Sequence, residues 1–308
     1  MISFTRESVL VAAARAHLLV LDIDGVLLDA RPSFYRAARE TALWAAARAL
    51  GKEAGALPAQ DDVRAFKDVG GWNDDFDLAA GLAWAVVLRE TRHMPIASTA
   101  RRSAGGLPTL FEAVHALVPP ATIAAMRSPE VRQRSAARYA GRAHCAELYG
   151  IDPERFPDLP EEGLFADERQ LASASLLRSC ALDLALFTGR NRAETRLALE
   201  RYGLAVPEER CVVDDGVLPR KPAPDGLLHL ARYASSGPLI YVGDAVDDQN
   251  SVLAYRALAA ERPLPEIIFV RVTDGAAPSN EWMADHGVDV TVDGLDAWLE
   301  ALPRGENT

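Results

Sequence analysis

The strongest constraint on the fold is a change of rhythm along the chain. From about residue 182 onward, short apolar runs alternate with helical patterns, which is typical of a parallel sheet with crossover helices. One more run of this kind occurs near the N-terminus, at residues 18–21, and it stops abruptly at Asp22. A run that is apolar at every position fits a strand buried on both faces. The sequence therefore predicts an α/β core whose first strand is far from the others in the chain.

The alternation gives an order of expected elements. Strands are expected at residues 18–22, 182–187, 210–213, 238–242, 267–272 and 288–292. Crossover helices are expected at residues 192–202, 224–233, 246–258, 280–286 and 295–302. Two further helices are expected, one over residues 5–16 and one that Asp167 caps and that continues through Leu177.

The middle of the chain has a different pattern. Residues 32–165 contain no convincing strand, and helices are expected from Pro32 to Gly51 and over residues 74–89, 108–118 and 129–149. The stretch Thr91–Gly106 contains a proline and two glycines and is expected to be a loop. A chain of 308 residues exceeds the usual single core. The simplest organisation is a discontinuous core, residues 1–30 and 166–308, with a mostly helical insert at residues 31–165.

Charge and cysteine content exclude several classes of protein. The chain has 44 acidic and 33 basic side chains and a net charge of −11, which argues against a general binder of nucleic acid or of anionic membranes. This balance still allows a local basic pocket for a small anion. The 3 cysteines are too sparse for a disulfide scaffold, and no stretch is apolar enough to predict a membrane span or a signal peptide. We therefore expect a cytoplasmic protein.

Polar clusters follow three of the apolar runs. Asp22 and Asp24 come after the first run, Thr188-Gly189-Arg190 after the second, and Asp244 with Asp248 after a later one. Ligands of open parallel sheets bind outside the carboxyl ends of the strands, so these clusters are expected to converge. Four facing carboxylates would repel one another unless a cation lay between them. Oxygen ligands suit a hard ion, and Mg²⁺ is the cation expected here.

Further residues complete a site for phosphate chemistry. Lys221 supplies a fixed positive charge, Thr188 a hydroxyl, and Gly189 a backbone N–H that a ligand can approach closely. A carboxylate nucleophile, Mg²⁺, a lysine and hydroxyl donors together are typical of phosphoryl transfer, in which positioning and charge neutralisation do most of the catalysis.

These residues occur in an order that resembles the haloacid dehalogenase (HAD) superfamily, in its phosphoglycolate phosphatase and β-phosphoglucomutase-like branch. The first motif of that family, DxDGxxxD, stands at Asp22–Asp29, and its fourth, GDxxxD, at Gly243–Asp248. Between them lie Thr188, which closes a strand, and Lys221, which precedes a proline. The resemblance implies a Rossmann-like parallel-sheet core with an inserted, mostly α-helical cap of the C1 type.

The resemblance also implies roles for these residues. Asp22 would attack phosphorus and form an aspartyl-phosphate, and Asp24 would protonate the leaving oxygen and then activate water. Thr188, Gly189, Arg190 and Lys221 would hold the phosphoryl group. Mg²⁺ would be held by Asp22, the backbone carbonyl of Asp24 and Asp244, with Asp248 as a further ligand or a residue that orients one. Asp247 competes with Asp248 for this last role, and spacing favours Asp248.

One string of the insert also resembles a family feature. The stretch Phe66–Asp77 is similar to a cap loop, in which Trp72, Asn73 and Asp74 would face the substrate. An equally good interpretation is a helix start with Asn73 or Asp74 as its N-cap. Trp44 and Trp84 are expected in the core of the insert.

The sequence thus predicts a Mg²⁺-dependent phosphoric monoester hydrolase that acts on a small phosphorylated metabolite. Asp24 favours a phosphate ester over a halide, because a leaving halide needs no proton. The alternatives are a phosphomutase of the β-phosphoglucomutase type and a non-catalytic HAD-like binding protein. The expected partner is a small-molecule phosphate ester, with neither nucleic acid nor membrane, and the sequence predicts no oligomeric state.

Overall fold

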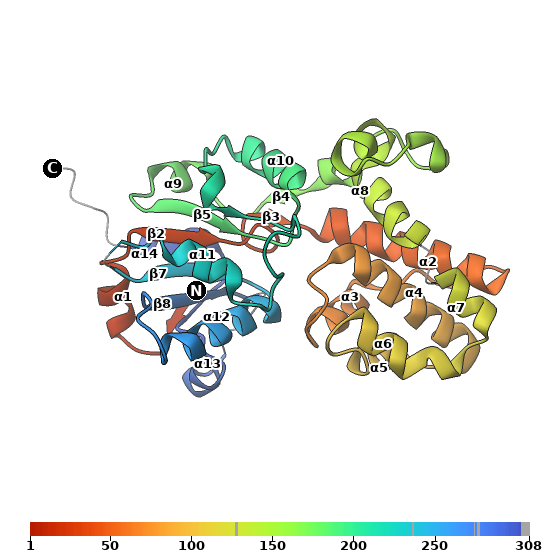
Figure 1. Ribbon diagram of the computed structural model, residues 1–308, viewed down its shortest axis with the longest axis horizontal. Helices are drawn as coiled ribbons and strands as arrows, with labels where there is room; N and C mark the ends of the chain where they lie inside the picture. The colour runs from red at the N-terminus through yellow and green to blue at the C-terminus, as the bar shows by residue number, and fades with distance from the viewer. Residues whose placement is uncertain (127–128, 236, 274, 276–277, 303–308) are drawn as a thin grey trace. The chain divides into compact units, whose positions relative to one another are not determined.

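The computed structural model describes residues 1–126, 129–235, 237–273, 275 and 278–302. The chain forms two compact units. The first, here called the core unit, contains Met1–Asp29 and Arg169–Thr308, and the second, the insert unit, contains Ala30–Glu168 (Figure 1).

Among the described residues, the core unit is built on a seven-stranded sheet of order β1-β9-β8-β7-β2-β5-β6. The strands are β1 (Ile2–Phe4), β2 (Leu18–Leu21), β5 (Asp183–Phe187), β6 (Cys211–Val212), β7 (Leu239–Gly243), β8 (Ile267–Val272) and β9 (Val290–Val292). Every neighbouring pair is parallel except β1 with β9. The strand that stands alone in the sequence, β2, therefore lies between β5 and β7 inside the sheet, which confirms the expected α/β class.

Helices cover both faces of this sheet (Figure 1), as the unbroken apolar runs predict. Leu19 and Leu21 of β2 pack on one face, while Leu18 and Val20 pack on the other. The first face is covered by α1 (Ser8–Ala13), α9 (Ala174–Ser179), α10 (Arg192–Tyr202) and α14 (Leu295–Ala301). The second is covered by α11 (Asp225–Ala231), α12 (Val246–Ala259) and α13 (Asn280–Asp285).

The start of α10 is fixed by a reciprocal cap. The side chain of Asn191 accepts a hydrogen bond from the Glu194 amide, and the Glu194 carboxylate accepts one from the Asn191 amide. This arrangement satisfies two donors that a helix start otherwise leaves without partners. The short segment between β5 and α10 therefore ends at a fixed helix start.

The insert leaves and re-enters the core unit through one short antiparallel pair. Strand β3 (Leu28–Asp29) pairs with β4 (Arg169–Gln170), and Asp29 lies opposite Arg169. The two ends of the insert are thus neighbours, although about 140 residues separate them in the sequence.

The insert unit is helical in its described residues and has its own apolar core. Its elements are η1 (Arg31–Tyr35), α2 (Arg36–Leu50), α3 (Gln60–Lys67), α4 (Asp75–Arg92), α5 (Ile96–Arg101), α6 (Leu107–Val114), η2 (His115–Leu117), α7 (Pro120–Met126), α8 (Pro129–Tyr149), η3 (Pro153–Arg155) and η4 (Leu164–Asp167). Trp84 on the central helix α4 is 1% exposed, as expected. Trp44 is partly buried against the same core, and the Arg134 guanidinium lies 4.4 Å from its ring centroid.

One residue interrupts the long helix α8. Gly141 has φ 70° and ψ 168°, which lie outside the helical region and in a region that is essentially restricted to glycine. The next two amides, of Arg142 and Ala143, donate to the carbonyls of Pro160 and Glu161 at 3.1 Å instead of continuing the helical ladder. The uninterrupted helix expected over residues 129–149 is therefore corrected to two helical pieces joined at Gly141.

Three other expectations are wrong. The stretch Thr91–Gly106 is not all loop, because Ile96–Arg101 forms α5 directly after Pro95, which a helix tolerates at its N-terminus. Asp167 does not cap a helix: it is the last residue of η4, the chain continues into β4, and Ser173 caps α9. The first helix begins only at Ser8, because residues 2–4 form the edge strand β1, which is too short to leave a pattern in the sequence.

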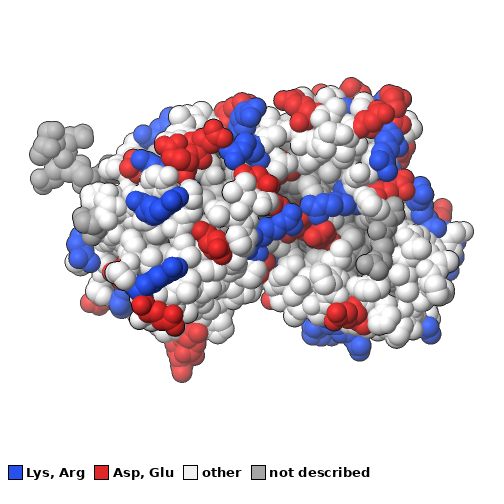
Figure 2. Space-filling view, in the orientation of Figure 1, with Lys and Arg blue, Asp and Glu red and all other residues white. Residues whose placement is uncertain are grey.

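The surface carries charges of both signs. On the face shown in Figure 2, Lys and Arg are interspersed with Asp and Glu. Several are partners, such as Arg36 with Glu40 in the insert unit and Arg192 with Asp215 in the core unit. Within the described ranges, no helix combines the length and the apolar character that crossing a membrane requires.

The break in α8 gives a stability prediction. Gly141→Ala should lower the free energy of unfolding by about 2–4 kcal/mol, because a Cβ at this position would lie 2.3 Å from the Gly163 nitrogen and the backbone angles exclude a side chain. Gly51→Ala is the matched control: Gly51 has φ 66°, but a Cβ there would meet no atom within 4 Å. The control should lose only about 1 kcal/mol. Equal losses in urea unfolding would contradict the prediction.

Candidate functional site

Three strand ends carry the polar residues that the sequence singles out. Asp22 follows β2 directly, Thr188 follows β5, and Asp244 follows β7. Leu21 is in register with Leu186 of β5 and with Val242 of β7, so the three strands end at the same level of the sheet. The loop after β6 brings Lys221 to the same edge, because its ammonium group contacts Asp22.

A buried lysine connects two of the acids. Lys221 Nζ lies 2.9 Å from Oδ2 of Asp22 and 2.7 Å from Oδ1 of Asp248. The Lys221 side chain is 1% exposed, and the rings of Phe187 and Tyr241 lie 4.8 and 5.6 Å from its ammonium nitrogen. Opposite charges and aromatic faces thus surround the ammonium group where water would otherwise solvate it.

Burial dominates the ionisation of this group. Burial raises the pKa of Asp22 from its ordinary 3.8 to about 7, Lys221 opposes the rise, and Asp248 and Asp24 add to it. Burial lowers the pKa of Lys221, but Asp22 and Asp248 together raise it by more, so the lysine stays charged. Asp22 is therefore a carboxyl group that burial favours in its protonated form, next to a permanent positive charge.

Asp248 has partners at both oxygens. Oδ1 forms an ion pair with Lys221 and accepts from the hydroxyl of Tyr241, and Oδ2 accepts from the backbone amides of Asp244 and Ala245 at 3.1 and 3.0 Å. Burial, followed by the nearby Asp248 charge, raises the pKa of Tyr241 well above its usual range, so this hydroxyl remains a donor. Asp248 therefore orients the lysine and the turn that carries Asp244.

The acids form a set that can hold a metal ion. Oxygen atoms of Asp22, Asp244 and Asp248 all lie within 4.8 Å of one another. Gly25 makes room for this set: it has φ 74°, and a Cβ there would lie 2.0 Å from a carboxylate oxygen of Asp244. Mg²⁺ prefers oxygen ligands and is usually held by one or two carboxylates together with waters and phosphate oxygens. Asp248 is fully buried, and its oxygens contact Lys221, Tyr241 and two backbone amides, so it is suited to support the other two acids. Asp22 is in contact at both oxygens as well, with the Ile23 amide and with Lys221.

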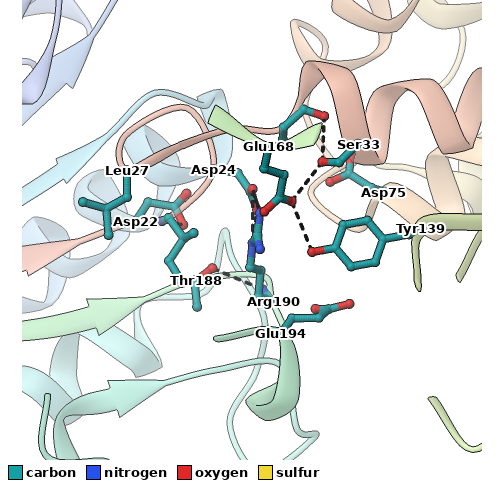
Figure 3. Close-up of polar contacts among 12 residues, drawn as sticks. Asp22, Asp24, Leu27, Ser33, Asp75, Tyr139, Glu168, Thr188, Arg190 and Glu194 are labelled. Atoms are coloured by element: carbon teal, nitrogen blue, oxygen red, sulfur yellow. Dashed lines mark hydrogen bonds and ion pairs between the residues drawn. The ribbon is translucent and has the colours of Figure 1, made fainter. Parts of the chain in front are cut away.

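The second acid of the first motif has a different partner. Nη2 of Arg190 donates to Oδ1 of Asp24 at 2.6 Å, and Nε lies 3.2 Å from each oxygen of that carboxylate (Figure 3). The amide of Arg190 donates to Oγ1 of Thr188 at 3.2 Å. The structure thus brings Asp24, Thr188 and Arg190 together. The guanidinium of Arg190 is paired with the Asp24 carboxylate. Gly189, between Thr188 and Arg190, is partly buried.

The predicted residues of the insert unit have mixed outcomes. Trp72 cannot face a substrate, because it is 1% exposed in the apolar core of the insert and its indole N–H donates to Ser103. Asp74 is the N-cap of α4, as one of the two interpretations predicts, and its other oxygen contacts Arg132 at 2.6 Å. Asn73 is half-buried directly before this cap.

Sequence reasoning missed two parts of the site. Tyr241 lies inside the apolar strand β7, so the sequence pattern does not mark its hydroxyl as part of a polar site. The alternation of side chains along the strand places Tyr241 on the face where its hydroxyl contacts Asp248. The pairing of Arg190 with Asp24 joins residues 166 positions apart and has no local signature.

Two solved structures share this fold over nearly the whole chain. A phosphatase, Tt82, from Thermococcus thioreducens is 23% identical, with a TM-score of 0.59 over 92% of this chain and 97% of that one. A protein of Haemophilus somnus 129PT, described as a predicted phosphoglycolate phosphatase, is 13% identical, with a TM-score of 0.51 over 93% of this chain and 97% of that one. No protein-family model and no curated protein matches the sequence. These likenesses confirm the expected fold, a parallel-sheet core with an inserted helical unit.

The raised pKa of Asp22 predicts how stability depends on pH. The native state binds a proton at Asp22 up to about pH 7, whereas the unfolded chain releases it near 3.8, so native stability falls as pH rises between these values. Asp22→Asn has no such proton to lose. In metal-free buffer, the melting temperature of Asp22→Asn minus that of the wild type should therefore increase from pH 5 to pH 8. A difference that stays constant over this range would show that Asp22 is not destabilised by burial.

Proposed function

We propose that this protein is a HAD-type phosphatase that hydrolyses a small phosphorylated metabolite through an aspartyl-phosphate on Asp22. The observation that supports it best is the buried contact of Lys221 with Asp22 at 2.9 Å, at the carboxyl end of β2. A carboxylate beside a fixed cation in an apolar site is suited to attack an anionic phosphoryl group, because the cation offsets the repulsion between the two.

In the first half of the reaction, Oδ of Asp22 attacks phosphorus and the bond from phosphorus to the ester oxygen breaks. Asp24, two residues further along, donates a proton to the leaving oxygen. Lys221 neutralises the charge of the phosphoryl oxygens, and Thr188 and the amide of Gly189 donate hydrogen bonds to them.

In the second half, the Asp24 carboxylate takes a proton from a water molecule whose oxygen attacks the same phosphorus. The bond from phosphorus to Asp22 breaks, and phosphate and the free carboxylate result. Asp24 thus acts as acid and then as base, which regenerates the starting protein.

Mg²⁺ fits the acid set of this site. Asp22 and Asp244 would hold it, with the Asp24 carbonyl, and Asp248 would orient Asp244 through its amide. When bound, the ion supplies positive charge against the phosphoryl oxygens. The insert unit, Ala30–Glu168, is proposed to be the cap that selects the leaving group and excludes water.

Hydrolysis of p-nitrophenyl phosphate with Mg²⁺ tests the proposal directly. We expect release of p-nitrophenol, and release of phosphate from at least one member of a panel of sugar and amino-alcohol phosphates. Asp22→Asn should lower kcat by at least about 10³-fold, since the amide cannot act as the nucleophile. Wild-type turnover by this variant would refute the nucleophile assignment. Conversion of hexose 1-phosphate into the 6-phosphate without free phosphate would identify a mutase instead.

Metal binding can be measured without turnover. Mg²⁺ should raise the melting temperature of the wild type, and Asp244→Asn should remove most of this rise, because it replaces a charged ligand by a neutral one. Asp247→Asn is the matched control from the start of α12. A rise in melting temperature that persists in Asp244→Asn but disappears in Asp247→Asn would place the ion at Asp247 and refute Asp244 as its ligand.

A further inference from the structure

The ion pair of Arg190 with Asp24 lies at the centre of the proposed chemistry (Figure 3). The guanidinium contacts both carboxylate oxygens, through Nη2 at 2.6 Å and Nε at 3.2 Å. Contact with both oxygens fixes the rotation of a carboxylate as well as its position. The Arg190 side chain is 1% exposed, whereas that of Asp24 is 27% exposed. The acid can therefore reach solvent while the group that holds it cannot.

Arg190 is itself held by its backbone. Its amide donates to the Thr188 hydroxyl at 3.2 Å, and its carbonyl accepts from the Asp214 amide at 2.9 Å. The next residue, Asn191, is the N-cap of α10 and belongs to the reciprocal cap with Glu194. The guanidinium thus projects from a segment with little freedom to move, which is the requirement for aiming another side chain.

The sequence assigns Arg190 to the phosphoryl group, but the geometry favours a different role. A phosphoryl group that bound this guanidinium would have to compete with the charged, buried contacts to Asp24. Lys221 already supplies a cation next to the nucleophile. We propose that Arg190 is a positioning residue that aims the Asp24 carboxylate, and that it matters most when this carboxylate activates water. The inference rests on the proposed phosphatase function.

The second half of the reaction depends more than the first on the alignment of the Asp24 carboxylate. In the first half, Asp24 gives its proton to the ester oxygen as the ester bond breaks and the bond from Asp22 to phosphorus forms. The carboxylate that remains accepts donors on both oxygens, as it does here from Arg190. In the second half, it must take a proton from a water molecule aligned with phosphorus, while the bond from phosphorus to Asp22 breaks. Misalignment of the carboxylate slows this step directly.

Rapid-quench kinetics with p-nitrophenyl phosphate separate the two halves. Nitrophenolate leaves with little help from an acid, so its formation reports the first half alone. In Arg190→Gln and Arg190→Lys, we expect a burst of p-nitrophenol close to one per active site, followed by slow turnover. The ratio of burst rate to steady-state rate should rise at least about tenfold over the wild type, since general base catalysis contributes roughly 10²–10⁴-fold. Acid quenching should trap the phosphorylated protein.

The control is Arg192→Gln, two residues further along. Arg192 is 46% exposed and contacts Glu208 and Asp215 on the surface. This variant should keep the wild-type ratio. Inhibition by inorganic phosphate provides a second readout, and its inhibition constant should stay within about twofold of the wild type in both Arg190 variants, because a change in aim leaves phosphoryl binding intact.

Three results would overturn the inference. A higher KM and a weaker inhibition by phosphate, without a burst, would return Arg190 to the phosphoryl group. A burst amplitude and a steady rate that fall together, with a lower melting temperature, would show a purely structural role. A wild type that releases phosphate from no ester in the panel would refute the proposed function and this inference with it, whereas active wild type with an unchanged ratio in the variants refutes the inference alone.

Discussion

The buried positive charge of Lys221 is the constraint on which the core unit depends. An ammonium group that is 1% exposed is tolerated only when opposite charges lie close to it, and Asp22 and Asp248 provide them. These residues come from the loop after β6, the end of β2 and the start of α12, so the sheet must bring three distant segments to one point. Removal of either acid would leave the buried ammonium group with one opposite charge instead of two. The same arrangement holds Asp22 where an attacking carboxylate is needed, so folding and the proposed chemistry depend on one contact.

The acids around this contact have different partners and different proposed roles. Asp248 receives hydrogen bonds from Tyr241 and from two backbone amides, so it organises its neighbours. Asp22 and Asp244 are the proposed ligands of a cation, and Asp24 is paired with Arg190, which we propose aims it. Four acids that a sequence pattern groups together thus occupy four different electrostatic environments. Environments that differ in this way allow identical side chains to act as nucleophile, acid, ligand and support.

The sequence predicts the core well because its signals are local and repeated. The strand β8 and the helix α10 have the expected bounds, and the strand ends indicate where Asp22, Thr188 and Asp244 meet. Features that depend on tertiary contacts were beyond its reach. The edge strand β1 has only three residues, and Trp72 reads as a surface residue although Phe66 packs against it inside the insert. Arg190 and Asp24 meet across 166 positions, and a single sequence holds no record of such a pairing.

The antiparallel pair of β3 and β4 has an evolutionary consequence. It places the point where the chain leaves the core unit next to the point where it returns, with Leu28 opposite Gln170. All seven strands of the core sheet lie outside the insert. A segment whose ends are already joined in this way can be lengthened, shortened or replaced while the geometry of the sheet is preserved. Under the proposed function, changes to residues of the insert would alter which substrate is recognised and leave untouched the acids and the lysine that are proposed to perform the reaction.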